Sequence, residues 1–161
     1  MKRILSILVL ILVAVFWNSA AMAQSDDGKA GWEKNIQSSK DDLSVYTHKP
    51  TESRIDVYDK ELKNPSQSAS VIEAFHRKLK DTVGFKLVND TLGCEIPMTS
   101  VTDCTRAQYK FENSDVKDIR VEVVSFTKER HVFFIVLYYP EKSRDEVWGE
   151  YLRRITLIDK E

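Results

Sequence analysis

The stretch Val132–Tyr139 reads VFFIVLYY and is apolar at every position, with Pro140 directly after it. A strand with one face in water alternates apolar and polar side chains, whereas a strand covered on both faces does not need to alternate. The stretch therefore predicts a central strand between two layers. It decides the fold, because one helix cannot cover both faces of this strand and two helices on opposite faces can.

Two segments have the apolar periodicity of amphipathic helices and can form these layers. The first begins with Asn64 as the cap and Pro65 in the first helical position, and it ends before Gly84, a residue type that commonly follows a helix. The second begins at Ser143, which can form a capping box with Glu146. Their apolar stripes are Val71, Ile72, Phe75, Leu79 and Val83 in the first helix, and Val147, Trp148, Tyr151, Leu152 and Ile155 in the second.

Five other segments predict strands, mostly because apolar and polar residues alternate along them. Short turns join the last three strands of the chain, which favours antiparallel pairing. In the second of these three, Arg120 and Glu122 alternate with valines, so we expect one face of that strand to be in water. The five segments are Leu43–Thr47, Ile55–Val57, Phe85–Val88, Ala107–Phe111 and Ile119–Val123.

The predicted elements follow one another in the order β-β-α-β-β-β-β-α. They predict an α+β fold, an α/β/α sandwich whose mainly antiparallel sheet is flanked by two helices. A chain of 161 residues is long enough for one domain and short for two. We expect a single domain over residues 40–161, preceded by a flexible lead-in over residues 24–39 whose start is polar and contains glycine.

The N-terminus has the three parts of a cleavable signal peptide over residues 1–23. Lys2 and Arg3 supply positive charge, Ile4–Trp17 is apolar apart from one serine, and Ala21-Met22-Ala23 is an A-x-A cleavage site. A retained membrane anchor needs about 20 apolar residues, and this run is too short. We expect cleavage after Ala23 and a periplasmic or secreted protein with no stable membrane anchor.

Charge and composition exclude two classes of partner. The whole chain has 24 basic and 25 acidic residues, and removal of the two basic residues of the signal peptide leaves 22 against 25. Nucleic-acid binding needs a basic stripe, and binding to a membrane surface needs a polybasic or amphipathic segment. The sequence has neither pattern, so we expect no nucleic acid and no membrane surface among the partners.

Cys94 and Cys104 are the two cysteines of the chain. An even number of cysteines in an oxidising compartment favours a disulfide. A redox or metal-binding pair is the alternative, but the spacing is not C-x-x-C and no histidine lies nearby in the sequence. We therefore expect a structural Cys94–Cys104 disulfide, which stabilises the fold by about 3 kcal/mol if it acts through chain entropy.

The histidines His48, His76 and His131 do not belong to any recognisable catalytic or metal-binding motif. We expect His76 at the edge of the core, and His131 on the same side of a strand as Glu129. No serine lies in G-x-S-x-G, and the chain has five glycines and no phosphate-binding loop. The sequence thus predicts no catalytic, cofactor-binding or metal-binding residues, and a protein that is not an enzyme.

Aromatic residues are frequent in the final third of the chain. Phe133, Tyr139, Trp148 and Tyr151 lie on the predicted central strand and the second helix. One interpretation is that they pack together as the core between these two elements. The other is that part of the set lines a groove or surface that binds a ligand or a partner protein. The sequence does not separate the two interpretations.

The order and character of several segments between about residues 40 and 158 are similar to a known family. These segments are the hairpin from Leu43 to Val57, Ala74–Leu79, Gly84–Val88, Arg106–Phe111, Val132–Tyr139 and Leu152–Leu157. In this layout the chain resembles the PsbP-like family of small exported proteins, which includes the bacterial DcrB-like envelope proteins. The resemblance implies an α/β/α sandwich that acts by binding, as an accessory or scaffold protein, with no catalytic residues.

A second resemblance covers only the start of the domain. Trp32-Glu33, Asp42-Leu43 and Val45-Tyr46-Thr47 resemble the opening of some bacterial members of the lipid-binding START fold. The first resemblance favours a non-enzymatic binding or accessory protein that contacts another envelope or secreted protein. The second implies the alternative, a carrier of a small apolar ligand or lipid. We predict the binding or accessory protein and keep the carrier as the alternative.

Overall fold

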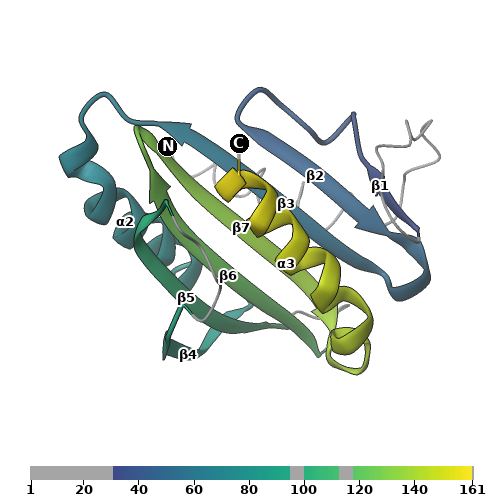
Figure 1. The fold of residues 1–161 in the computed structure, drawn as a ribbon. Helices are drawn as coiled ribbons and strands as arrows, with labels where there is room; N and C mark the ends of the chain where they lie inside the picture. Colours follow the sequence, from purple (N-terminus) through teal and green to yellow (C-terminus); the bar gives the residue numbers. More distant parts are fainter. Residues whose placement is uncertain (1–30, 95–99, 113–117, 161) are drawn as a thin grey trace.

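The computed structural model of the chain describes residues 31–94, 100–112 and 118–160 (Figure 1). The predicted signal peptide, residues 1–23, and the beginning of the predicted lead-in lie outside the described residues. Within these residues the chain forms seven strands and two α-helices. They are β1 (Trp32–Lys34), β2 (Leu43–His48), β3 (Ser53–Glu61), α2 (Ser68–Lys80), β4 (Phe85–Leu92), β5 (Thr102–Phe111), β6 (Ile119–Lys128), β7 (His131–Pro140) and α3 (Arg144–Lys160).

The strands form one open sheet in the order β1-β2-β3-β7-β6-β5-β4, and every neighbouring pair is antiparallel. Strands β1 to β3 form one meander and β4 to β7 form another. Helix α2 joins the two meanders and carries the chain from β3 to the far edge of the sheet. The last strand returns to the middle, where β7 pairs with β3 on one side and β6 on the other. The prediction of a central strand at Val132–Tyr139 is confirmed.

Each face of the sheet carries one helix. Consecutive side chains of β7 point to opposite faces, so Val136 packs in the cluster that includes Phe75 of α2, and Ile135 packs with Tyr151 of α3. Figure 1 shows α3 in front of the sheet and α2 behind it. We call the two sides the α3 face and the α2 face. The predicted α+β fold, an antiparallel sheet flanked by two helices, is confirmed.

A 3₁₀ turn precedes each helix; because of it α2 begins one turn later than predicted, whereas α3 begins at Arg144, directly after Ser143, as predicted. Asn64 caps the first turn as expected, and its side chain accepts a hydrogen bond from the backbone nitrogen of Ser66 at 3.1 Å. The capped residues Pro65–Gln67 are 3₁₀ and not α-helical. The residues Glu141–Ser143 form the corresponding turn before α3. The predicted apolar stripe of α3 faces the sheet, with Tyr151 fully buried.

The end of α2 differs from the prediction. The helix stops at Lys80, and Val83, which was expected on its apolar face, is 85% exposed in the turn before β4. Gly84 has a φ of +94°, and a side chain at this position would approach the carbonyl oxygen of Glu112 to 2.8 Å. The glycine therefore serves the close approach of β4 to the end of β5, four residues after the helix has ended.

The sheet contains a strand that the sequence analysis did not predict. Strand β1 lies within residues 24–39, the expected flexible lead-in, and pairs with β2 so that Trp32 is opposite His48. Trp32 is buried and its ring stacks on that of His48, with 5.2 Å between the ring centroids. The sheet therefore extends to Trp32, and burial of this indole accounts for a strand of only three residues.

Candidate functional site

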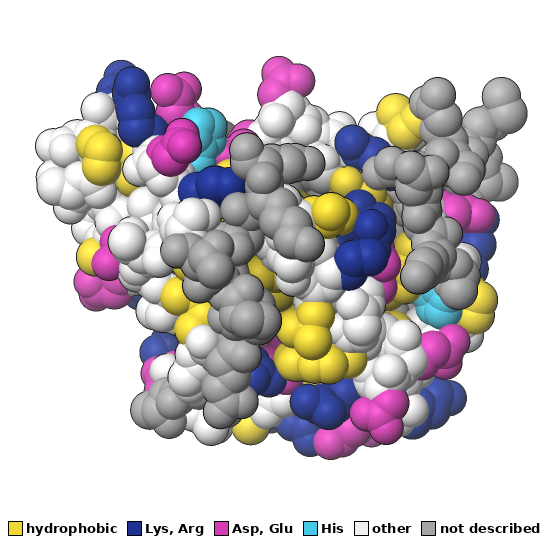
Figure 2. Space-filling model, viewed as in Figure 1, with side chains coloured by type: hydrophobic (Ala, Val, Ile, Leu, Met, Phe, Trp, Pro, Cys, Tyr) yellow, Lys and Arg dark blue, Asp and Glu magenta, His cyan; other side chains and the backbone are white. Residues whose placement is uncertain are grey.

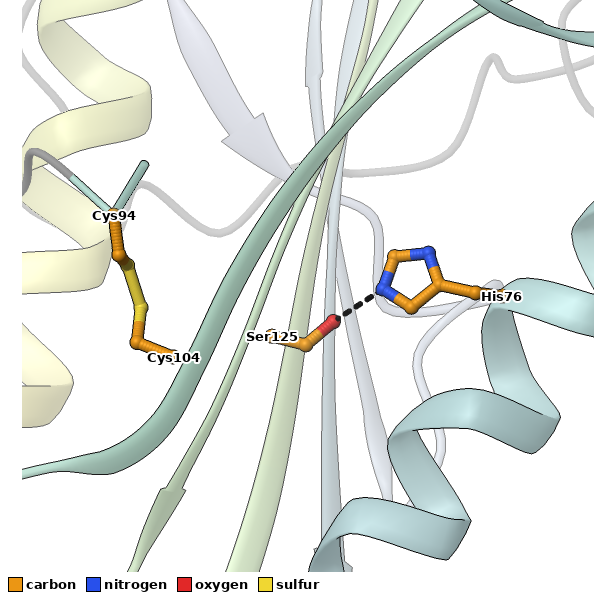
Figure 3. The surroundings of a disulfide bond; sticks show 4 residues. All are labelled: His76, Cys94, Cys104 and Ser125. Carbon is orange, nitrogen blue, oxygen red and sulfur yellow. Dashed lines mark hydrogen bonds between the residues drawn. A yellow bond between two sulfur atoms is a disulfide. The ribbon is translucent and has the colours of Figure 1, made fainter. Parts of the chain in front are cut away.

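The predicted disulfide between Cys94 and Cys104 is present. Cys94 follows β4 and Cys104 lies near the start of β5, with 5.9 Å between their Cα atoms. Both residues pack against the core on the α3 face. Figure 3 shows the disulfide on one side of the sheet, and His76 with Ser125 on the other. The disulfide thus connects the segment after β4 to the beginning of β5.

The four aromatic residues of the predicted binding surface occupy different environments. Tyr139 and Tyr151 are 1% and 0% exposed and belong to the core between β7 and α3. Phe133 and Trp148 are half-buried. Phe133 lies near the start of β7, about 20 Å along the strand from Tyr139 at a rise of about 3.3 Å per residue. Core packing is therefore correct for the two tyrosines, and of the four residues only Phe133 and Trp148 keep exposed surface.

Trp148 has two guanidinium groups close to its ring. The Cζ atom of Arg106, from β5, is 4.9 Å from the ring centroid, and the Cζ atom of Arg144, one turn earlier on α3, is 4.7 Å away. The negative face of an indole attracts a guanidinium at this distance. We call Trp148, Arg106 and Arg144 the Trp148 patch. Figure 2 shows hydrophobic side chains exposed beside the N-terminal half of α3, with Lys and Arg side chains next to them.

A buried carboxylate supports the Trp148 patch from the sheet. Glu122 on β6 is 1% exposed, and its Oε1 accepts a hydrogen bond from the Gln108 amide at 2.7 Å. The Nε of Arg106 donates to the other oxygen at 3.4 Å, and the hydroxyl of Tyr139 donates to Oε1 at 3.4 Å. The expectation that Glu122 lies on a face in water is wrong, because these neighbours and the start of α3 cover it.

The same environment determines the protonation of Tyr139. Burial, together with the negative charge of Glu122, raises the pKa of Tyr139 to about 12. The phenol therefore stays protonated at neutral pH and can donate to the carboxylate. With Tyr139, Gln108 and Arg106 all donating to it, Glu122 holds the guanidinium of Arg106 in place beside the indole of Trp148. Glu122 accepts hydrogen bonds from all three neighbours, so this cluster is suited to holding Arg106 in position and not to transferring a proton.

His48 and His131 lie at the ends of strands, and each is within hydrogen-bond distance of one polar side chain. Nδ1 of His48 lies 2.6 Å from Oγ1 of Thr51, and Nδ1 of His131 lies 2.6 Å from Oδ1 of Asp59. Glu129, the residue expected beside His131, instead lies in the turn before β7 with a φ of +54°. The alternation of a strand does not extend through this turn, so the expectation that His131 and Glu129 lie on the same side of a strand is wrong, and the carboxylate beside His131 is that of Asp59 in β3.

His76 forms hydrogen bonds between α2 and the sheet. Its Nδ1 is 2.8 Å from the hydroxyl of Tyr109, and its Nε2 is 3.2 Å from the hydroxyl of Ser125 (Figure 3). The ring is half-buried, as the edge-of-core prediction expected. Burial lowers the pKa of His76, and Lys80 lowers it further. Tyr109 and Ser125 are fully buried, so this serine–histidine pair presents no accessible nucleophile and instead attaches α2 to β5 and β6.

The sequence analysis also missed two buried ion pairs. In β3, Nη2 of Arg54 donates to Oδ2 of Asp56 at 2.9 Å, on the α2 face. In α3, Glu150 accepts hydrogen bonds from Arg153 and Arg154, each at 2.7 Å. Burial acts to raise the pKa of Glu150, but the two arginines outweigh it and leave the pKa below its ordinary value. The spacing of the α3 residues was the available signal, because residues three and four apart are neighbours on a helix.

Two further findings concern the described residues as a whole. Among them, no three side chains of His, Cys, Asp or Glu come close enough together to hold a metal ion. No helix in the same part of the chain is both long and apolar enough to cross a membrane.

Neither a protein-family model nor a curated protein matches this chain. The resemblance to the PsbP-like family therefore stays a prediction from the layout of the elements.

Proposed function

We propose that this chain is a secreted or periplasmic, non-enzymatic binding protein that acts by contact with another envelope or secreted protein. The signal-peptide pattern over residues 1–23 supports export. The Cys94–Cys104 disulfide supports it as well, because disulfides persist mainly in oxidising compartments. The observation that carries the binding proposal is the Trp148 patch, a half-exposed tryptophan with two arginines at its ring.

The composition of the Trp148 patch is that of a protein-binding site. Tryptophan and arginine are the residues that most often dominate the free energy of protein–protein binding. Arg106 is held by Glu122, so little side-chain entropy is lost when a partner binds against it. The side chain of Arg144 is 47% exposed and can donate hydrogen bonds to a carboxylate. We therefore expect a partner that presents an apolar residue to Trp148 and an aspartate or glutamate to Arg144.

The buried charges support binding over catalysis. The buried carboxylates Asp56, Glu122 and Glu150 each lie in an ion pair with an arginine. A catalytic acid or base needs a proton that it can gain or lose near neutral pH and access to a substrate. In this protein the oxygen atoms of these three carboxylates accept hydrogen bonds from arginine, and all three side chains are buried. They stabilise the charged arginines and the packing around them, which is a structural role.

The alternative function is a carrier of a small apolar ligand or lipid, and both the START-like opening of the domain and the aromatic residues of the final third suggested it. Tyr139 and Tyr151 pack inside the core, and the hydroxyl of Tyr151 donates to the carbonyl oxygen of Ile135 at 3.1 Å. Rings packed in this way fill the core between β7 and α3. They therefore favour a protein that binds a partner at its surface over one that carries a ligand inside. Native mass spectrometry of gently purified protein tests the alternative. A mass equal to that of the bare chain, with no rise in Tm on adding lipid, contradicts it.

The binding proposal predicts that Trp148→Ala abolishes capture of the partner. Tagged protein without residues 1–23 is used to capture proteins from envelope extract and from the secreted fraction, and we expect one stoichiometric partner. The matched control is Leu157→Ala, which removes a 41% exposed apolar side chain from the same helix, away from the patch. The control should keep the partner and the Trp148 variant should lose it, with both variants folded by circular dichroism. Repeated captures without a partner, or equal capture by both variants, contradict the proposal.

A further inference from the structure

Asp103, near the start of β5, has a backbone conformation that is unfavourable for a residue with a side chain. Its φ is +52°, in the left-handed region, and it lies where the pairing of β5 with β6 shifts register between Thr102 and Thr105. Aspartate tolerates this region better than most residues, but it adopts it only where the surrounding structure requires it. Here the conformation of Asp103 is held by contacts on both faces of the sheet.

The register shift leaves Asp103 and Cys104 as a bulge in β5, and these two residues make contacts on opposite faces of the sheet. On the α2 face, Oδ2 of Asp103 accepts a hydrogen bond from the hydroxyl of Ser68, the buried first residue of α2, at 2.7 Å. On the α3 face, Cys104 is bonded to Cys94 and packs against the core. The disulfide and the start of α2 therefore meet through two consecutive residues of β5.

The start of α2 has an acidic partner that comes from the sheet and not from its own first turn. Its N-cap residue, Gln67, makes no side-chain capping bond, and the first turn of the helix contains no acidic residue. An acidic side chain near the N-terminus stabilises a helix through its partial positive charge. Asp103 provides this carboxylate from the sheet. Loss of its position would leave the first turn of α2 without an anionic partner.

Close to the bulge, a buried hydroxyl group of β6 lacks a hydrogen-bond partner in the part of the chain that the structure describes. Thr127 of β6 is directly opposite Thr102, and its hydroxyl is buried without a hydrogen-bond partner among the described residues. A buried hydroxyl that lacks a partner costs free energy, and such groups call for an explanation. A constrained backbone, a cross-link and an unpaired hydroxyl thus occur together at the start of β5. Local strain of this kind concentrates at sites that change state.

We propose that the Cys94–Cys104 disulfide is a redox-sensitive switch for the start of α2. A protein dithiol reduces the disulfide: two electrons and two protons convert it into two thiols, and the dithiol becomes a disulfide. Without the cross-link, the start of β5 leaves the left-handed conformation at Asp103. The carboxylate then separates from Ser68, and the first turn of α2 opens. The oxidised protein keeps α2 attached along its full length.

Hydrogen exchange of the full chain without residues 1–23, before and after reduction by dithiothreitol, tests the switch. The informative amides are Ile72–Phe75, because they bond to carbonyls of the first turn of α2. Reduction should increase their exchange about fivefold more than that of the amides in Val147–Ile155 of α3, the upper end of the usual effect of a charge at a helix N-terminus. An equal increase in the two helices means that the disulfide only stabilises the whole fold, and it overturns the proposal.

Two variants separate the switch from general destabilisation. Asp103→Gly removes the carboxylate and suits the left-handed backbone, so the amides of α2 should exchange faster even with the disulfide intact. Reduction should then affect α2 and α3 equally. The matched control is Asp118→Gly, which changes an exposed aspartate with a φ of +59° far from α2 in the sequence and should respond to reduction as the original chain does. A selective response of α2 to reduction that survives in Asp103→Gly also overturns the proposal.

Discussion

The two helices cover opposite faces of the same sheet, but they are attached to it in different ways. Helix α3 places Val147, Tyr151 and Ile155 against the sheet, all fully buried. Of the residues of α2, only Ser68 and Ile72 are buried. The remaining contacts of α2 are half-buried side chains, among them Val71, Phe75 and Leu79, and hydrogen bonds from single polar groups. Helix α3 therefore contributes fully buried side chains to the core, whereas α2 is attached mainly by half-buried side chains and a few polar interactions.

The largest expected effect is on the α3 side. Tyr151→Ala removes a fully buried ring, and the cavity that it leaves should lower the free energy of unfolding by about 3–5 kcal/mol. Tyr151→Phe is the matched control and should cost about 1 kcal/mol, because it removes only the hydrogen bond to the carbonyl oxygen of Ile135. Urea denaturation monitored by circular dichroism measures both. A loss below about 1.5 kcal/mol for Tyr151→Ala would mean that α3 is not part of the core.

A smaller effect is expected for an aromatic ring on α2. Phe75 stacks on Phe134 with 4.0 Å between ring centroids, but the ring is half-buried. Phe75→Ala should lower the free energy of unfolding by about 2 kcal/mol, since part of the ring is already in water. The same denaturation experiment measures it. A loss equal to that of Tyr151→Ala would remove the difference between the two helices.

The contrast between the helices was partly visible in the sequence. The uninterrupted apolar run of β7 predicts a strand covered on both faces, and the stripe of Val147, Tyr151 and Ile155 predicts a helix that can cover one of them. These are local patterns that have one packing solution. Strand β1 was not predictable, because three residues are too few for alternation to be recognised. Only its pairing with β2 and the burial of Trp32 define it.

The Trp148 patch shows why the contacts of the candidate site could not be predicted from the sequence. Trp148 was in the predicted set, but Arg106 and Glu122 come from two other strands, and nothing in the sequence says that they meet it. Alternation in β6 correctly separates Glu122 from Val121 and Val123 onto opposite faces. It cannot say which face is in water, because that depends on where the start of α3 lies. Tertiary packing therefore decided the environment of Glu122, a buried carboxylate beside the patch.

The smallest expected effect is a pH dependence that belongs to α2. Burial lowers the pKa of His76, so the folded protein binds a proton less readily than the unfolded chain, whose histidine has a pKa of about 6.5. The groups that face the ring are Tyr109 and Ser125 from the sheet, Lys80 from α2, which also lowers the pKa, and Asp90 from β4, which raises it.

The stability that neutral His76 contributes is present above pH 6.5 and is lost as the pH falls through the lower, folded-state pKa. We expect a smaller loss than for Phe75→Ala, because the ring is only partly buried and both hydroxyls can accept hydrogen bonds from a protonated imidazole. His76→Gln, which does not titrate, should flatten the fall in the free energy of unfolding between about pH 7.5 and pH 5. An unchanged pH profile in this variant would show that α2 is held without regard to the protonation of His76.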